Sequence, residues 1–225
     1  YEFSACLVGS EMCIRDRFYS ERTAKMAETY ISIEKIRSLA EVGTIDEFKG
    51  STDMNEIFAA CAIASKKYLG LIPYDEQLTA AAELTKGRIT EMKTGEGKTL
   101  CAAFAASYMA KNGHNVRILT FNDYLAKRDS EWMKPIYDAL GISSACILHS
   151  TDIADKKEMY KNQIVYITAR EAGFDFLRDF VANTPEDCVQ TDFDFCIADE
   201  ADSMMIDEAR VPLVIACLLY TSDAA

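Results

Sequence analysis

The strongest constraint on the fold is the segment at residues 92–99, Met-Lys-Thr-Gly-Glu-Gly-Lys-Thr, which lies between a strand-like run and a helix-like run. Gly95 and Gly97 let the backbone turn so that successive N–H groups converge on one point. Lys98 adds a positive charge, and the hydroxyl of Thr99 can ligate Mg²⁺. These residue types in this order predict a phosphate-binding loop. Its candidate nucleotide-binding residues are Thr94, Gly95, Glu96, Gly97, Lys98 and Thr99.

This loop is a variant of the common pattern GxxxxGK[ST], because Met92 stands where the first glycine is expected. The residues match x-x-Thr-Gly-x-Gly-Lys-Thr instead, a form that helicase-like motor domains use. Eight residues taken alone could match by chance. The interpretation therefore depends on a second element elsewhere in the chain.

An acidic motif about a hundred residues later supplies that element. The run at residues 193–198 is typical of a buried strand, and it leads directly into Asp199-Glu200-Ala201-Asp202. At the end of a parallel strand, Asp199 would hold Mg²⁺ and Glu200 would orient and deprotonate the water that attacks the γ-phosphate of ATP. The alternative is an acidic helix N-terminus favoured by the helix dipole. Together with the loop, the motif favours an ATP·Mg²⁺ site.

The pattern along the chain changes near residue 87. Before it, residues 17–71 are mostly helical in pattern, with apolar residues at helical spacing in 25–40 and 54–69. After it, the predicted strands are residues 88–92, 116–120, 145–149, 164–168 and 193–198. The predicted helices are residues 98–112, 123–140, two shorter ones after Asp155 and Ala169, and a short one at 201–210. This alternation predicts an α/β fold whose parallel sheet is covered by helices on both faces, with the ligand at the carboxyl ends of the strands.

One stripe of the helix that follows the loop is expected to face the sheet. It comprises Leu100, Ala103, Phe104, Ser107 and Tyr108.

Composition narrows the class of protein. The net charge of −12 argues against a nucleic-acid partner, because phosphate contacts need clustered Lys and Arg. No apolar run approaches the roughly eighteen residues that a membrane-spanning helix needs. The cysteines of the central region lack CxxC spacing and are expected to be small buried hydrophobic residues. The simplest interpretation of this composition is a cytoplasmic protein that uses ATP.

Four segments in order resemble SecA, the ATPase motor family of bacterial protein export: EMKTGEGKTL at 91–100, FNDYLAKRD at 121–129, GFDFLRD at 173–179 and DEADSMMIDEAR at 199–210. The resemblance covers roughly residues 56–215. It implies a RecA-like P-loop motor domain preceded by a helical segment. It also implies preprotein substrate and a SecYEG-type membrane channel as partners, at the cytoplasmic face of the cell membrane, and leaves a homodimer open.

The resemblance also implies roles for individual residues. Gln77 matches a glutamine that contacts the adenine base, and a Gln side chain can donate and accept at once. Motors of this class bind ATP between two RecA-like domains and take an arginine from the second. We therefore expect this chain to bind ATP without meaningful turnover. Residues 122–124 and 173–179 resemble coupling elements, and Asp207, Glu208 and Arg210 resemble an interdomain polar cluster.

Three departures leave open whether the chain is a housekeeping motor or a divergent, accessory-type paralogue. Thr79-Ala80-Ala81 replaces the usual glycine pair, residues 169–172 replace an Asn-rich stretch, and Val211 replaces the usual threonine before Pro212. Two other functions remain as alternatives. Asp199 to Asp202 is literally Asp-Glu-Ala-Asp, as in DEAD-box RNA helicases, and the chain could instead be a non-catalytic nucleotide-binding fragment.

The two ends have an unusual property. Residues 12–16 and 217–221 can be back-translated into DNA sequences that are reverse complements of each other and match a transposon end used in sequencing libraries. Residues 1–17 and 217–225 are therefore predicted to be translated adapter and are excluded from the fold argument. The remaining divisions are a helical N-terminal segment at 18–71 and a truncated first nucleotide-binding domain, DEAD-like, at 72–216.

Overall fold

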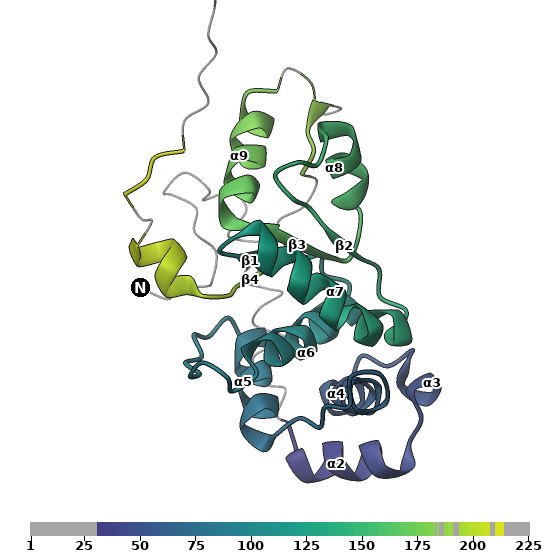
Figure 1. Ribbon diagram of the computed structural model, residues 1–225. Helices are drawn as coiled ribbons and strands as arrows, with labels where there is room; N and C mark the ends of the chain where they lie inside the picture. The colour runs from purple at the N-terminus through teal and green to yellow at the C-terminus, as the bar shows by residue number, and fades with distance from the viewer. Residues whose placement is uncertain (1–30, 183, 185–186, 191–193, 208–209, 214–225) are drawn as a thin grey trace, which may run out of the picture.

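The computed structural model describes residues 31–182, 184, 187–190, 194–207 and 210–213, in which a layer of helices packs against a parallel sheet (Figure 1). Both predicted adapter segments and residues 25–30 of the first predicted helix lie outside the described residues.

The helical layer forms the amino-terminal part of the described chain. Its elements are α2 (Ile33–Val42), α3 (Ile45–Phe48), α4 (Met54–Ala64), the π-helical turn η1 (Ser65–Leu69) and α5 (Asp75–Thr85). The Asp53 carboxylate caps α4 by accepting from the N–H groups of Asn55 and Glu56. Helix α4 is buried around most of its circumference because it contacts α2, α6 and α7. The helical pattern predicted at 54–69 is confirmed, and that at 25–40 is confirmed over its described part.

Four parallel strands form the sheet of the described chain, in the order β2-β3-β1-β4. They are β1 (Val116–Thr120), β2 (Ser144–Cys146), β3 (Ile164–Thr168) and β4 (Phe195–Ala198). In the register, Val116 lies beside Ile164 of β3 and Phe195 of β4. The predicted α/β fold with a parallel sheet is confirmed, and β2 is shorter than expected.

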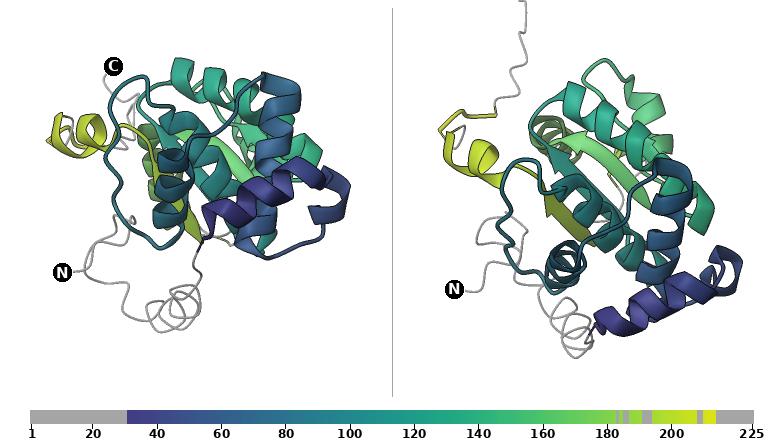
Figure 2. Two further views of the ribbon diagram at one scale, coloured as in Figure 1. Left: turned by 90° about the horizontal axis from the view of Figure 1, so that it is seen from below. Right: turned by 60° about the horizontal axis from the view of Figure 1, so that its bottom comes forward.

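Helices cover both faces of this sheet (Figure 2). Helices α6 (Lys98–Lys111) and α7 (Asp123–Leu140) pack on one face, and α8 (Ile153–Met159) and α9 (Ala169–Phe180) lie on the other. The chain crosses from β1 through α7 to the edge strand β2, where its direction reverses, and it returns through α8 to β3 and through α9 to β4. The neighbouring strands β1 and β3 are therefore followed by helices on opposite faces of the sheet. This arrangement places a crevice at the carboxyl ends of the strands next to β1.

The strand predicted at residues 88–92 is wrong, because this segment is a loop. The N–H of Arg88 bonds the carbonyl oxygen of Glu83, and its guanidinium pairs with the Glu83 carboxylate. These contacts hold the start of the segment against the end of α5. Ile89 is 86% exposed, so the apolar residue that suggested a buried strand lies in solvent.

The stripe predicted to face the sheet from α6 is also wrong in its direction. The rings of Phe104 and Tyr108 contact Phe58 of α4 edge-on, with centroids 5.6 and 6.5 Å apart. Nearly all of α6 is buried, because helices cover it on one side and β1 and β4 on the other. A stripe cannot identify the sheet side of a helix that is enclosed on every side. The cysteine prediction is confirmed for Cys61 and Cys101, which are buried.

Candidate nucleotide-binding site

The two sequence motifs meet at the carboxyl edge of the sheet. Strand β4 ends at Ala198 and is followed by Asp199, whose N–H bonds the carbonyl oxygen of Leu119 near the end of β1. The loop at residues 93–97 leads into the N-terminus of α6, where Lys98 is close enough for its charge to act on Asp199. Unpaired N–H groups and the helix dipole make such an N-terminus favourable for a phosphate group.

The loop is held in its turn by its own residues. The N–H of Lys93 donates to Oε2 of Glu96 at 2.7 Å, and the N–H of Glu96 donates to the Lys93 carbonyl at 3.2 Å. Gly95 and Gly97 have φ values of +88° and +82°, which only glycine adopts without cost. The N–H groups of Leu100 and Cys101 then bond the Gly97 carbonyl and begin α6. Thr94 and the other residues of 93–96 are exposed.

Gln77 comes from α5 and is in contact with this loop. Its Nε2 donates to the Glu96 carbonyl at 2.7 Å, and its Oε1 accepts from the N–H of Tyr74 at 3.0 Å. A Cβ atom at Gly97 would lie 2.3 Å from Nε2 of Gln77, so a side chain at residue 97 would displace this amide from the loop. The structure therefore brings the predicted base-reading glutamine to the predicted phosphate loop. In the structure, the nitrogen and the oxygen of the Gln77 amide both have hydrogen-bond partners in the protein.

The acidic motif forms a sharp turn at the end of β4. The N–H of Glu200 donates to Oδ1 of Asp199 at 2.9 Å. Glu200 has a φ of +54°, the only positive value at a non-glycine residue in the described chain. This conformation costs on the order of 1–2 kcal/mol and is concentrated at functional sites. The turn keeps Asp199 half-buried and leaves Glu200 exposed next to it.

Burial and the surrounding charges together set the ionisation of Asp199. Burial raises the pKa of Asp199, and the charge of Asp129 raises it further. The hydrogen bond from the Glu200 N–H and the charges of Lys98 and Arg128 lower it, but they do not offset the effect of burial. A divalent cation would favour the ionised form. The donor set suits Mg²⁺, which prefers hard oxygen ligands, since the Thr99 hydroxyl lies in the first turn of α6. Within the described residues, no three His, Cys, Asp or Glu gather as a metal site, so water and phosphate oxygens would complete the shell.

Arg128 and Asp129 were missed as site residues in the sequence. Both lie in α7, and both act electrostatically on Asp199. Neighbouring residues on a helix do not normally face each other, so their pairing has no local pattern. The signal available was their position in the segment at 121–129, which follows β1 at the same edge of the sheet.

The comparisons with known proteins agree with this geometry. The family model described as the SecA DEAD-like domain matches residues 19–224. The chain belongs to the SecA family. The resemblance seen in the four segments is thereby confirmed.

Individual relatives show how much of a SecA protein is present. Protein translocase subunit SecA 3 of Mycolicibacterium vanbaalenii is 41% identical over 197 residues, covering 88% of this chain and 25% of the relative. The SecA subunit of Ehrlichia canis is 47% identical over 174 residues, which cover 76% of this chain and 20% of the relative. The SecA subunit of Koribacter versatilis is 48% identical over 160 residues, which cover 71% of this chain and 16% of the relative. The chain thus spans at most a quarter of the length of these relatives.

Proposed function

We propose that this chain forms the ATP-binding part of the first motor domain of a SecA-type protein translocase, which couples ATP hydrolysis to preprotein export. The observation that carries the proposal is the juxtaposition of the phosphate loop and Lys98 with Asp199 and Glu200 at one edge of the sheet. A helix N-terminus with a lysine beside a half-buried carboxylate is suited to a triphosphate with its metal ion. Family membership points to the same function.

Each residue of the site has a separate task in this proposal. Lys98 neutralises the β- and γ-phosphates, and Thr99 and Asp199 hold Mg²⁺. Bound Mg²⁺ would neutralise the charge that develops on the phosphate oxygens. Glu200, exposed beside Asp199, orients the attacking water and accepts its proton. Gln77 exchanges its bond to the Glu96 carbonyl for the edge of the adenine base.

Binding and turnover are expected to separate in this chain. A motor of this class takes a charge-stabilising arginine from a second domain, and the chain spans at most a quarter of its matched relatives. We therefore expect ATP to bind without meaningful hydrolysis. A steady ATPase rate of the chain that is lost in Glu200→Gln would contradict this.

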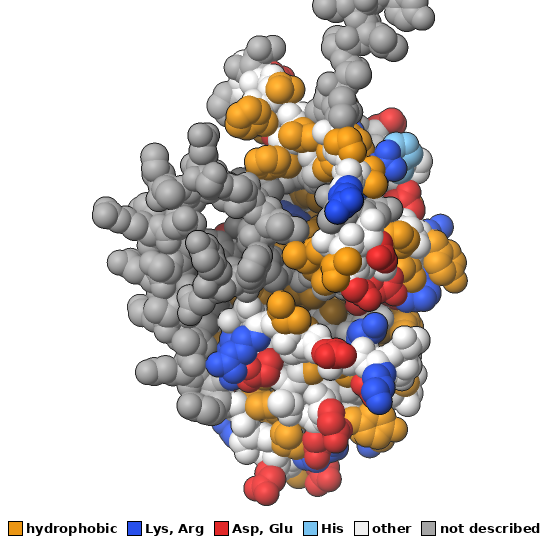
Figure 3. Space-filling model, turned by 90° about the vertical axis from the view of Figure 1, so that its left-hand side faces the viewer, with side chains coloured by type: hydrophobic (Ala, Val, Ile, Leu, Met, Phe, Trp, Pro, Cys, Tyr) orange, Lys and Arg blue, Asp and Glu red, His pale blue; other side chains and the backbone are white. Residues whose placement is uncertain are grey.

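The partners follow from the names of the relatives, which are protein translocase subunits. A preprotein and a SecYEG-type channel at the cytoplasmic face of the membrane are the proposed partners. No described helix is long and apolar enough to cross a bilayer. An RNA helicase is less well supported: the chain carries a net charge of −12, and on the described part of the face in Figure 3 basic side chains lie among acidic ones.

Titration of a fluorescent ATP analogue with Mg²⁺ tests the proposal. Lys98→Ala should abolish binding, because the lysine supplies the charge beside the loop. Lys134→Ala is the matched control, since this lysine pairs with Asp138 on the exposed surface of α7 and should leave the affinity unchanged. Unchanged affinity in Lys98→Ala would end the proposal.

A further inference from the structure

Arg128 and Asp129 form an unusual pair near the predicted triphosphate end of the site. Nε of Arg128 donates to Oδ1 of Asp129 at 2.8 Å, and Nη2 lies 2.8 Å from the same oxygen. The Asp129 side chain is 3% exposed, whereas that of Arg128 is 46% exposed. The guanidinium also lies 6.0 Å from the ring centroid of Tyr124, one turn earlier in α7. The arginine is thus held at its inner edge and open to solvent at its outer edge.

The position of this pair connects it to the acidic motif. Helix α7 begins at Asp123, just after β1 ends at Thr120, and the N–H of Asp199 bonds the carbonyl oxygen of Leu119 in β1, so α7 and the acidic motif start at the same edge of the sheet. Arg128, Asp129 and Asp199 act electrostatically on one another at this edge. The buried Asp129 carboxylate also acts on Tyr166 of β3, which places it between α7 and the sheet. The carboxylates of Asp129, Asp199 and Glu200 and the cations of Arg128 and Lys98 therefore share one edge of the sheet.

We propose that Arg128 contacts the terminal phosphate of a bound nucleoside triphosphate and that Asp129 is the residue that positions it. The inference rests on the proposed nucleotide site and adds a second cation to it from α7. A guanidinium carries five N–H donors in a planar fork, and the contacts to Asp129 use only one side of that fork. The remaining donors suit phosphate oxygens.

This role predicts discrimination between triphosphate and diphosphate. Loss of Arg128 should weaken binding of a non-hydrolysable ATP analogue about tenfold, the usual effect of one charge-assisted hydrogen bond, and should change ADP affinity by less than about twofold. Arg128→Lys should recover only part of the loss, since an ammonium lacks the fork. Lys127→Ala is the control, because that exposed lysine lies next to Arg128 and faces Glu131 at 4.0 Å.

A simpler role for Arg128 would be to neutralise the buried Asp129 carboxylate. A double-mutant cycle separates the two, with Arg128→Ala, Asp129→Asn and their combination measured by calorimetric titration of both nucleotides. If Arg128 only neutralises Asp129, the double variant will regain wild-type affinity for the ATP analogue. If Arg128 contacts phosphate, the double variant will stay about tenfold weaker for the analogue while ADP binds normally. Asp129→Asn alone should weaken the analogue by a smaller factor.

The outcomes are distinguishable from failure of the nucleotide site itself. Wild-type protein that binds neither nucleotide would refute the proposed function and this inference together. Wild-type protein that binds both, with Arg128→Ala equal to wild type or weakened equally for both nucleotides, would overturn the inference alone. The double variant removes both charges, so it keeps the test valid if Arg128→Ala unfolds with an unpaired buried carboxylate.

Discussion

Removal of the buried lysine between α8 and α9 should cause a large loss of stability. Nζ of Lys156 lies 2.7 Å from Oε2 of Glu171 and 3.0 Å from Oδ1 of Asp175, and none of the three side chains is more than 5% exposed. The hydroxyl of Tyr160 donates to the other oxygen of Asp175 at 2.9 Å. Lys156→Met keeps an unbranched side chain that is one atom shorter, and it removes the charge and its hydrogen bonds.

The magnitude follows from what the variant leaves behind. Breaking a buried ion pair by removing one partner costs about 3–5 kcal/mol, because the remaining charge loses its compensation. Arg178 and Tyr160 still contact Asp175, and His149 still contacts Glu171, so the lower end of that range applies. About 3 kcal/mol corresponds to a fall in Tm of about 6–12 °C for a chain of this size.

The loss should depend on pH in a defined direction. Burial alone would raise the pKa of Glu171, but the hydrogen bonds and charges of Lys156 and His149 outweigh it and lower the pKa below the ordinary value of 4.5. A lowered carboxyl pKa contributes stability above the unfolded value, and that stability is lost as pH falls through the folded value. The difference between wild type and variant should therefore be largest near neutral pH and shrink below about pH 4.5.

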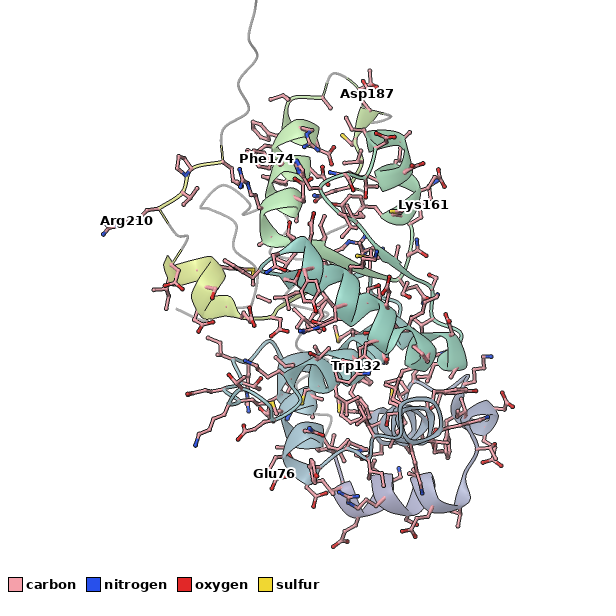
Figure 4. The ribbon with its side chains drawn as sticks, in the orientation of Figure 1. Glu76, Trp132, Lys161, Phe174, Asp187 and Arg210 are labelled. Atoms are coloured by element: carbon pink, nitrogen blue, oxygen red, sulfur yellow. The ribbon has the colours of Figure 1, made fainter. Side chains whose placement is uncertain are left out.

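Urea denaturation followed by tryptophan fluorescence measures both effects. The chain has one tryptophan, Trp132 on α7, 45% exposed and labelled in Figure 4. Lys161→Met is the matched control, since Lys161 pairs with Glu158 on the surface and should cost less than about 1 kcal/mol. The reasoning is refuted if Lys156→Met unfolds within about 1 kcal/mol of wild type at pH 7, or if its deficit grows on acidification.

Two further predictions concern the site. Gly97→Ala should weaken ATP about tenfold or more, because the new Cβ would meet Gln77 at 2.3 Å and because a left-handed φ disfavours alanine by about 1–2 kcal/mol. Gly113→Ala is the control, because Gly113 has a φ of +83° and no atom lies within 4 Å of the new Cβ. This variant has only the cost of the left-handed backbone and should bind ATP normally. Equal ATP affinities of the two variants in a titration would contradict the steric argument. Magnesium-dependent binding should weaken on acidification at a higher pH than an ordinary aspartate of pKa 3.8 would cause, because burial raises the pKa of Asp199. Asp199→Asn should lose this component of the pH profile, and identical profiles in the two proteins would argue against Asp199 as the metal ligand.

Local patterns in the sequence were sufficient for the elements around the site. Helix α7 was predicted at its observed bounds, because Asn122 caps its first turn and Gly141 ends it with a φ of +69°. Helix α6 was predicted to within one residue for the same reason, since the glycine turn of the loop precedes it and Gly113 follows it. Caps and glycine turns act over a few residues, so they can be recognised in the sequence without the tertiary structure.

Side-chain contacts and burial could not be predicted from the sequence in the same way. The predicted strand at 88–92 failed because Arg88 is held by Glu83, and the predicted sheet face of α6 failed because α4 covers that side. The Arg128–Asp129 pair was missed because it depends on the burial of the Asp129 side chain between α7 and the sheet, which the sequence does not reveal. In each case packing in the folded chain decides which side chains are buried and which meet, even where the partner is near in sequence.

The sequence by itself determined the family, the parallel α/β class and the residue types of a nucleotide site, because each of these depends on short-range order and periodicity. The tertiary structure decided which charges meet. Gln77 reaches the loop only because α5 packs on α6, and Lys98 acts on Asp199 only because β4 pairs with β1. Burial then sets the ionisation of that carboxylate, since the cost of desolvating a charge depends on everything packed around it.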